Sequence, residues 1–194
     1  MTDRKDMAAP DYITFGESLA FDPETGVITW KVGRPKHMAE VGSVAGSVNS
    51  KGYLVLGFLG KRYLAHRVAW LLTHKRWPEK FIDHKNGART DNRIANLREA
   101  TRAENMRNQP AQKTNTSGYK GIFLKRGRWY AQICGAGRKW SLGTYDTRQE
   151  AHAAYRGAAL VLHGDYANFL GPIPYVLTTA GKDFAAGRAK AGGA

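Results

Sequence analysis

Asp83 and His84 are neighbours in the sequence, and their side chains could together carry out chemistry on a phosphate group. The carboxylate of Asp83 and the side-chain amide of Asn105 offer hard oxygen ligands, which suit Mg²⁺ or Mn²⁺ and not zinc. An unperturbed histidine has a pKa of about 6.5, so His84 could take a proton from water at neutral pH. An isolated Asp-His pair more often belongs to a turn or a surface, but the downstream Asn96 and Asn105 favour a site.

The segments that carry these residues predict the order strand, polar loop, strand and helix. These elements are expected over residues 81–84, 85–92, 94–98 and from 101 onward. Thr101 and Glu104 form a capping box, which predicts the start of the helix that carries Asn105. Neighbours on a regular strand point to opposite faces. Asp83 and His84 can therefore serve one phosphate only if the strand bends or ends there, or if they flank the phosphate from two sides.

Antiparallel strands and one helix are expected before this segment. Alternating apolar residues predict strands over residues 27–30 and 53–58, and a further strand from residue 63. Helical spacing of apolar residues predicts a helix over residues 66–75. His66 opens this helix near the core, so a structural role is favoured for it over a phosphate contact. Asn92 is assigned to turn chemistry in the polar loop.

These motifs together resemble the His-Asn-His (ββα-metal) homing endonucleases of phage and bacterial genomes. The resemblance covers roughly residues 20–110. The stretches that carry it are Phe81-Ile82-Asp83-His84-Lys85-Asn86-Gly87, Asp91-Asn92-Arg93, Ile94-Ala95-Asn96-Leu97-Arg98 and Glu104-Asn105, with Ala65-His66-Arg67-Val68-Ala69-Trp70 upstream.

The resemblance implies a role for each residue of the motif. Asp83 and Asn105 would bind one divalent metal at the scissile phosphate, and His84 would be the general base that activates water. Asn96 would hold the loop between the two strands by hydrogen bonds to the backbone, and so orient His84. Three arginines are candidate phosphate clamps, although a solvated charged face is the commoner role for any one of them: Arg67, Arg93 and Arg98.

A second folding unit is expected after a linker that has almost no apolar residues. Three strands are expected over residues 119–122, 129–134 and 139–145. A second capping box at residues 147–150 then opens a helix, which has an apolar stripe over residues 151–162. Alternation along the strands predicts a sheet with one face packed on the helix and an exposed face of cations and rings, Trp129 and Trp140 included. For Trp129, core packing is an equally supported alternative.

This unit resembles the Apetala-type domain of plant ethylene-response factors, which also occurs attached to homing endonucleases. The match lies within residues 116–170, over the stretches 118–122, 129–133, 142–147 and 150–155. In that family the sheet contacts bases and phosphates of the major groove. The DNA-contact residues expected in this unit are Lys120, Lys125, Arg128, Trp129, Gln132, Lys139 and Tyr155. Phe123, Cys134 and Ser141 replace arginine or tryptophan of the plant domains, so the DNA sequence that is read would differ.

The composition agrees with a polyanion as the partner. The chain has 194 residues with 30 Lys and Arg against 16 Asp and Glu, and its formal net charge of +14 is typical of a protein that binds nucleic acid. The single cysteine, Cys134, excludes an intrachain disulfide and a zinc site with paired cysteines. No apolar run approaches the ~20 residues that span a bilayer, and the polar residues 1–10 do not form a secretion signal. We therefore expect a cytoplasmic protein, bacterial or phage-encoded in a host cell, with no membrane partner.

As a whole, the sequence predicts an α+β protein, with a ββα-metal nuclease module preceded by an antiparallel sheet, and a small three-stranded antiparallel sheet packed on one helix. The expected segments are a leader (residues 1–20), a nuclease domain (21–109), a linker (110–117), a DNA-binding domain (118–170) and a flexible tail (171–194). We expect a metal-dependent endonuclease that nicks double-stranded DNA as a monomer and needs no small-molecule cofactor. The main alternative is a non-cleaving, sequence-specific DNA-binding regulator. An RNA-binding protein fits less well, because the RNA major groove is too narrow for such a sheet.

Overall fold

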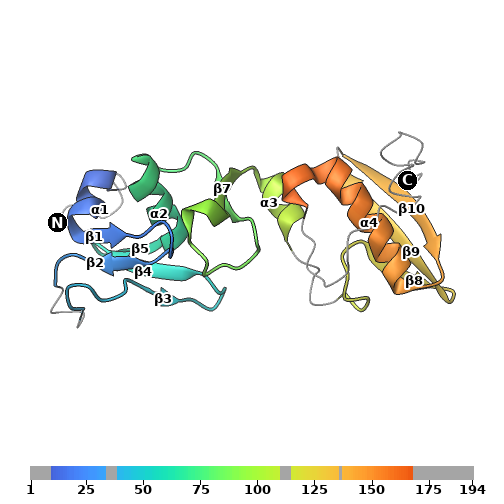
Figure 1. Cartoon of the computed structure of the whole chain (residues 1–194), viewed down its shortest axis with the longest axis horizontal. Coiled ribbons are helices and arrows are strands. Elements are labelled where there is room, and N and C mark those ends of the chain that lie inside the picture. Colours follow the sequence, from blue (N-terminus) through green and yellow to red (C-terminus); the bar gives the residue numbers. More distant parts are fainter. Residues whose placement is uncertain (1–9, 34–38, 110–114, 136, 168–194) are drawn as a thin grey trace. The chain divides into compact units, whose positions relative to one another are not determined.

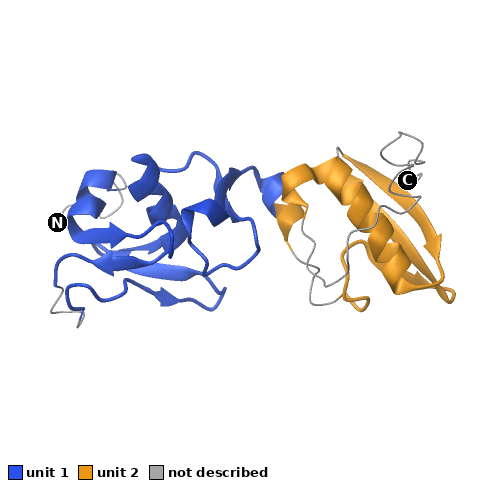
Figure 2. Cartoon of the chain, viewed as in Figure 1, with its two compact units in different colours: residues 1–105 blue, residues 106–194 orange. Residues whose placement is uncertain are grey.

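The computed structural model describes residues 10–33, 39–109, 115–135 and 137–167 (Figure 1). The chain forms two compact units, residues 1–105 and 106–194 (Figure 2). Both units combine α-helices with antiparallel strands, which confirms the predicted α+β class. Residues 110–114 of the expected linker and the expected tail, 171–194, lie outside the described residues. No helix in the described ranges is long and apolar enough to cross a lipid bilayer.

The first unit contains small antiparallel sheets and the helices that pack beside them. In chain order its elements are α1 (Tyr12–Ser18), β1 (Leu19–Phe21), β2 (Ile28–Trp30), β3 (Ser47–Val48), β4 (Leu54–Phe58), β5 (Lys61–Leu64), α2 (Ala65–His74), β6 (Phe81–His84), the 3₁₀ turn η2 (Ile94–Asn96), β7 (Leu97–Ala100) and the start of α3 (Arg102–Asn108). The boundary between the two units falls within α3. The sheets pair β1 with β2, β4 with both β3 and β5, and β6 with β7. The consecutive elements β6, β7 and α3 form the predicted ββα arrangement.

Residues 12–20, which we expected to belong to a leader, form α1 and most of β1. Asp11 caps α1 by accepting a hydrogen bond from the Thr14 amide. Phe15 is fully buried and stacks on Phe58 of β4, with 4.4 Å between the ring centroids. A single buried aromatic in so short a helix does not produce a recognisable helical period, and this is why the sequence did not predict the helix.

Helix α2 lies at the centre of the first unit's core. Its buried side chains are those of Ala65, His66, Val68, Ala69, Trp70 and Leu71. Ile28 and Leu56 from neighbouring strands pack into the same cluster. The helix ends at His74, because Lys75 adopts a left-handed backbone conformation with φ 57° and donates its amide to the Leu71 carbonyl. The sequence predicted a helix over residues 66–75, so each predicted end lies one residue after the observed one.

The β6–β7 hairpin differs from the prediction in one detail. β6 spans Phe81–His84 as expected. Residues 94–96 form the turn η2 before β7 begins, so only the second half of the strand expected over 94–98 is extended. In the antiparallel register Asp83 lies opposite Arg98, and His84 lies opposite Leu97. The turn leaves Asn96 outside the ladder, where its side chain is available to the loop.

The second unit is an antiparallel sheet covered on one face by a helix. Its elements are β8 (Ile122–Lys125), β9 (Arg128–Gly135), β10 (Arg138–Tyr145), α4 (Arg148–His163) and the 3₁₀ turn η3 (Gly164–Tyr166), and β9 is the central strand. Thr147 and Glu150 form the predicted capping box at the start of α4. Ala154 and Ala158 of α4 pack with Ile133 of β9 in a second core.

Candidate functional site

Asp83 and His84 lie at the end of β6, and both side chains are buried, with 4% and 5% of their surface exposed. Their partners differ. Asp83 Oδ2 accepts a hydrogen bond from Arg98 Nε at 2.9 Å and forms an ion pair with Nη2 at 2.7 Å. His84 Nε2 lies 3.1 Å from Asn92 Oδ1 in the loop. Neighbours on a regular strand would point to opposite faces, so the two side chains can serve one phosphate if the strand bends or ends at this pair. Because β6 ends at His84, that condition is met.

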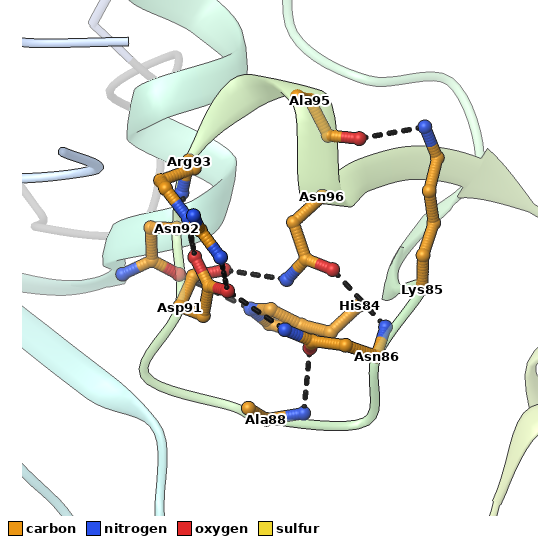
Figure 3. Close-up of polar contacts among 9 residues, drawn as sticks. All are labelled: His84, Lys85, Asn86, Ala88, Asp91, Asn92, Arg93, Ala95 and Asn96. Atoms are coloured by element: carbon orange, nitrogen blue, oxygen red, sulfur yellow. Dashed lines mark hydrogen bonds and ion pairs between the residues drawn. The ribbon is translucent and has the colours of Figure 1, made fainter. Parts of the chain in front are cut away.

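Asn96 closes the loop between β6 and β7 (Figure 3). Its Oδ1 accepts a hydrogen bond from the Asn86 amide at 3.0 Å, and its Nδ2 donates to the Asp91 carbonyl at 2.8 Å. Lys85 adds two links, from its amide to the Asn96 carbonyl at 2.9 Å and from Nζ to the Ala95 carbonyl at 2.7 Å. Both ends of the loop are therefore tied to η2, which fixes the backbone that follows β6.

Asp91 is a second polar centre of the same loop. Arg93 donates to its two carboxylate oxygens, from Nε at 2.8 Å and from Nη2 at 2.6 Å, and Asn86 Nδ2 donates at 2.7 Å. These contacts, with the Arg93 hydrogen bond as the largest cause, hold the pKa of the Asp91 carboxyl well below its ordinary value. The carboxylate is therefore ionised at neutral pH and keeps the loop closed.

The three candidate phosphate clamps all have partners within the first unit. Arg93 is bound to Asp91, and Arg98 is bound to the buried Asp83. The guanidinium of Arg67 donates to the backbone carbonyls of residues 78 and 80, both at 3.4 Å. These contacts explain each arginine by an intramolecular role, which sequence reasoning could not distinguish from a phosphate contact.

Aromatic rings enclose the imidazole of His84. The ring of His66 is perpendicular to it, with 5.1 Å between centroids, and the ring of Tyr53 lies 6.1 Å away. Burial lowers the pKa of His84, while the hydrogen bond that Asn92 Oδ1 accepts from the ring and the charge of Asp83 offset part of this effect. A lowered pKa keeps the imidazole neutral at neutral pH, which is the form that can accept a proton.

His66 forms one wall of this enclosure. Its side chain is 5% exposed, and burial lowers its pKa to about 3, with smaller contributions from the charges of His84 and Arg67. His66 is therefore neutral at neutral pH and adds no charge beside His84. This environment agrees with the structural role favoured from the sequence.

Asn92 is the residue that sequence reasoning missed. It is 1% exposed and contacts His84, whereas its position in a polar loop indicated turn chemistry. The turn between β1 and β2 supports it from outside the motif, since the Ile94 amide donates to the Pro23 carbonyl at 3.1 Å and Gly26 packs on the Asn92 backbone. The only signal in the sequence is that Asn92 lies within the motif stretch 91–93.

Gly26→Ala is expected to destabilise the first unit by at least about 1 kcal/mol. Gly26 has φ +75°, and an added Cβ would lie 2.6 Å from the carbonyl carbon of Asn92, so backbone strain and a clash act together. Gly16→Ala is the matched control, because nothing lies within 4 Å of its added Cβ and alanine favours the helix α1. Urea unfolding measures both variants. Equal stability of Gly26→Ala and the parent would contradict the close packing of this turn.

Asp83 and Asn105 provide oxygen atoms of the kind that a divalent metal needs. Asn105 is partly exposed in α3, whose first turn is capped by Thr101 and Glu104. Within the described ranges, no group of three or more His, Cys, Asp or Glu side chains could hold a metal ion. A site with one carboxylate and one amide suits Mg²⁺, which keeps several waters and binds substrate phosphates, whereas zinc requires more protein ligands. The donor set therefore fits a hard divalent cation.

The open face of the second sheet, away from α4, carries four of the expected DNA-contact residues. Ala131 and Ile133 pack in the core beside α4, so alternation along β9 turns their neighbours to the open face. Residues directly paired across the ladder share a face, and the pairs Lys125 with Arg128 and Cys134 with Lys139 extend it. The expected contacts on this face are Lys125, Arg128, Gln132 and Lys139. Phe123 stacks on Tyr130 here, with 5.5 Å between centroids.

Lys120, Trp129 and Tyr155 have other environments. Trp129 and Trp140 are partly buried and pack against the core beside α4, which favours the core-packing alternative that was left open for Trp129. Tyr155 is 4% exposed, and burial raises its pKa to about 12. Lys120 Nζ donates at 2.7–3.2 Å to three backbone carbonyls, those of Met106, Arg107 and Gln109. An ammonium has three donors, so these contacts occupy all of them.

Comparisons with known proteins bear on the first unit. The profile of a family described as HNH endonuclease matches residues 63–107, which contain the β6–β7 hairpin and most of α3. Protein 3.8 of Escherichia phage T7 is 32% identical to this chain over 91 residues, which make up 46% of this chain and 74% of that protein. The profile match includes Asp83, His84, Asn96 and Asn105.

Proposed function

Because this chain belongs to the HNH endonuclease family, we propose that it is a homing-type endonuclease that hydrolyses phosphodiester bonds in double-stranded DNA. HNH nuclease domains act on DNA and generally depend on a divalent metal. The observation that carries the proposal is the buried pair of Asp83 and His84 at the end of β6, beside a loop that Asn96 ties together.

The residues of the first unit have distinct roles in the proposed reaction. The neutral imidazole of His84 takes a proton from the attacking water. Asp83 and Asn105 would hold the metal through their side-chain oxygens. Mg²⁺ or Mn²⁺, when bound, would stabilise the negative charge that develops on the phosphate and the leaving oxygen. Asn96 acts only through the loop backbone, which it keeps in place so that His84 retains its orientation.

We further propose that a monomer nicks one strand. The motif occurs once in the sequence, so one chain supplies one site. A double-strand break would require a second chain or a second binding event. The match to a bacteriophage protein supports a bacterial cytoplasm as the setting, with the gene in a bacterium or in a phage that infects it.

The second unit is proposed to position the nuclease on its target. We assign the DNA contacts of this Apetala-type unit, residues 118–170, to the open face of its sheet, which is of a size to enter the major groove. The support is the array of Lys125, Arg128, Gln132 and Lys139 on that face, in a chain with a net charge of +14. Lys120, Trp129 and Tyr155 are assigned to the fold of the unit instead.

Replacing Lys125, Arg128 and Lys139 together by alanine is expected to reduce the salt dependence of DNA binding. The slope of log K against log salt is negative, and each lost phosphate contact makes it less steep by about 0.9. The slope of the triple variant should therefore be less steep by up to roughly 2.7. Arg138→Ala is the control, because alternation places Arg138 on the opposite face, paired with the buried Gly135. Fluorescence anisotropy over a salt series measures the slope. A triple variant with an unchanged slope would remove this face from the proposal.

A plasmid assay tests the proposed activity. Supercoiled plasmid is incubated with the full chain in the presence of Mg²⁺ or Mn²⁺, and separately with a chelator. Conversion to the open circle that requires the metal is the expected result. Plasmid that shifts on a gel but stays intact in every lane would support the non-cleaving regulator instead, and would overturn the enzyme.

A further inference from the structure

Asn92 is buried and contacts the His84 ring in the loop that Figure 3 draws. Its side-chain oxygen Oδ1 lies 3.1 Å from His84 Nε2, and only 1% of the residue is exposed. An amide oxygen can only accept a hydrogen bond, so Nε2 must carry a hydrogen in this arrangement. In a neutral imidazole the other nitrogen, Nδ1, then carries no hydrogen.

We propose that Asn92 is a positioning residue that holds His84 in the tautomer with hydrogen on Nε2, so that Nδ1 is the atom that takes the proton from water. This inference rests on the proposed function for the role of His84 as base. The proton of the attacking water moves to Nδ1, the hydrogen on Nε2 stays in its bond to Asn92 Oδ1, and the proton on Nδ1 later passes to solvent. Asn92 therefore contacts neither the substrate nor the reacting water.

Two neighbouring rings flank the imidazole of His84. The perpendicular ring of His66 and the tilted ring of Tyr53 limit rotation of the imidazole about its Cβ–Cγ bond. Asn92 in turn is held by its backbone, which packs on Gly26 of the β1–β2 turn. The acceptor is therefore placed by elements that come from two distant parts of the sequence.

The other half of the Asn92 amide argues against a purely structural role. Among the described residues, Asn92 Nδ2 is buried without a hydrogen-bond partner. An unsatisfied buried donor destabilises the fold, and an apolar side chain would avoid this cost. The benefit of an asparagine at this position is then the acceptor that it offers to His84.

The tautomer can be measured without any activity. Long-range ¹H–¹⁵N correlation spectra of histidine-labelled full-length protein at pH 8, without metal, should show His84 protonated at Nε2 and unprotonated at Nδ1. His84→Gln identifies the signal among the 6 histidines of the chain. Asn92→Ala should give a mixture of tautomers, whereas Asn92→Asp, which keeps the acceptor, should retain the Nε2-protonated form.

Asn86→Ala is the matched control in the same loop. Asn86 bonds Asp91 and the Ala88 amide but is not bonded to His84, so this variant should keep the tautomer of the parent. His84 protonated at Nδ1 in the parent would overturn the inference, and so would an unchanged tautomer in Asn92→Ala. If Asn92→Ala does not fold, the spectra of the parent and of Asn92→Asp still decide.

Kinetics separate this inference from the proposed function. With an active parent, Asn92→Ala should lower kcat on the order of 100-fold with little change in KM, because the base is misplaced while DNA binding is kept. Asn92→Asp should recover part of the loss. A parent that never cuts DNA would refute the proposed function, while the tautomer would still test the inference. A loss that falls on KM alone would overturn the positioning role.

Discussion

His84→Ala is expected to lower the rate of metal-dependent plasmid nicking by about 10²- to 10⁴-fold, which is the usual contribution of a general base. The imidazole is buried at the end of β6, and its lowered pKa keeps it neutral and able to accept a proton at neutral pH. The backbone of the loop is tied by Asn96 and Lys85, so the fold should survive the loss of the ring. Single-turnover nicking with excess enzyme gives the rate directly.

His74→Ala is the matched control for this substitution. His74 ends α2, is exposed to solvent and packs on Trp70, so its removal also deletes a histidine ring but leaves the loop intact. Full nicking by His74→Ala beside a large loss in His84→Ala would support the assignment. A His84→Ala protein that folds, binds DNA and nicks at the parent rate would remove His84 from the mechanism.

The sequence predicted the local frame of the site because that frame depends on local patterns. The spacing of Asp83, His84 and Asn96 falls within a single hairpin, and the capping box of α3 uses residues only three apart. The strand over 81–84 was predicted with the bounds that it has in the structure. Such patterns depend only on residues that are close in the sequence, so they can be recognised without knowledge of the tertiary fold.

The features that were missed depend on contacts between distant segments. Asn92 is buried because the β1–β2 turn packs on it, and Phe15 is buried because β4 supplies Phe58. Neither contact has a signature in the residues around it. The ion pair between Arg98 and Asp83 follows only from the strand register, which the sequence did not specify.

The second sheet shows how residue type can mislead. Trp129 has the same parity on β9 as the buried Ala131 and Ile133, so strict alternation places it beside α4 and not on the open face. On β10 the register shifts between Ser141 and Gly143, and a bulge of this kind breaks a simple count of alternate positions. Within one regular strand, odd or even position correctly predicts the face on which a side chain lies. The assumption that aromatic rings share the exposed face with the cations did not predict the face of Trp129.

Asp83→Asn is expected to abolish metal-dependent nicking and to lower the free energy of unfolding by about 3–5 kcal/mol. The carboxylate is the charged ligand of the proposed metal site, and it also neutralises Arg98, whose side chain is only 13% exposed. Removing one partner leaves the other as a buried charge without compensation. Glu99→Gln on the same hairpin is the control, because its partner Arg76 is half exposed and such pairs contribute about 1 kcal/mol or less.

The double variant Asp83→Asn/Arg98→Met separates the two roles of Asp83. Removing both charges takes away the buried unpaired arginine, so urea unfolding should show a recovery of much of the lost stability. Nicking and Mn²⁺ binding should both stay lost, because the carboxylate ligand is still absent. The electron paramagnetic resonance signal of free Mn²⁺ measures the binding. Recovery of stability without recovery of metal binding would establish that Asp83 contributes a ligand as well as a structural charge. A double variant that binds Mn²⁺ and nicks DNA at the parent rate would show that the metal is held elsewhere.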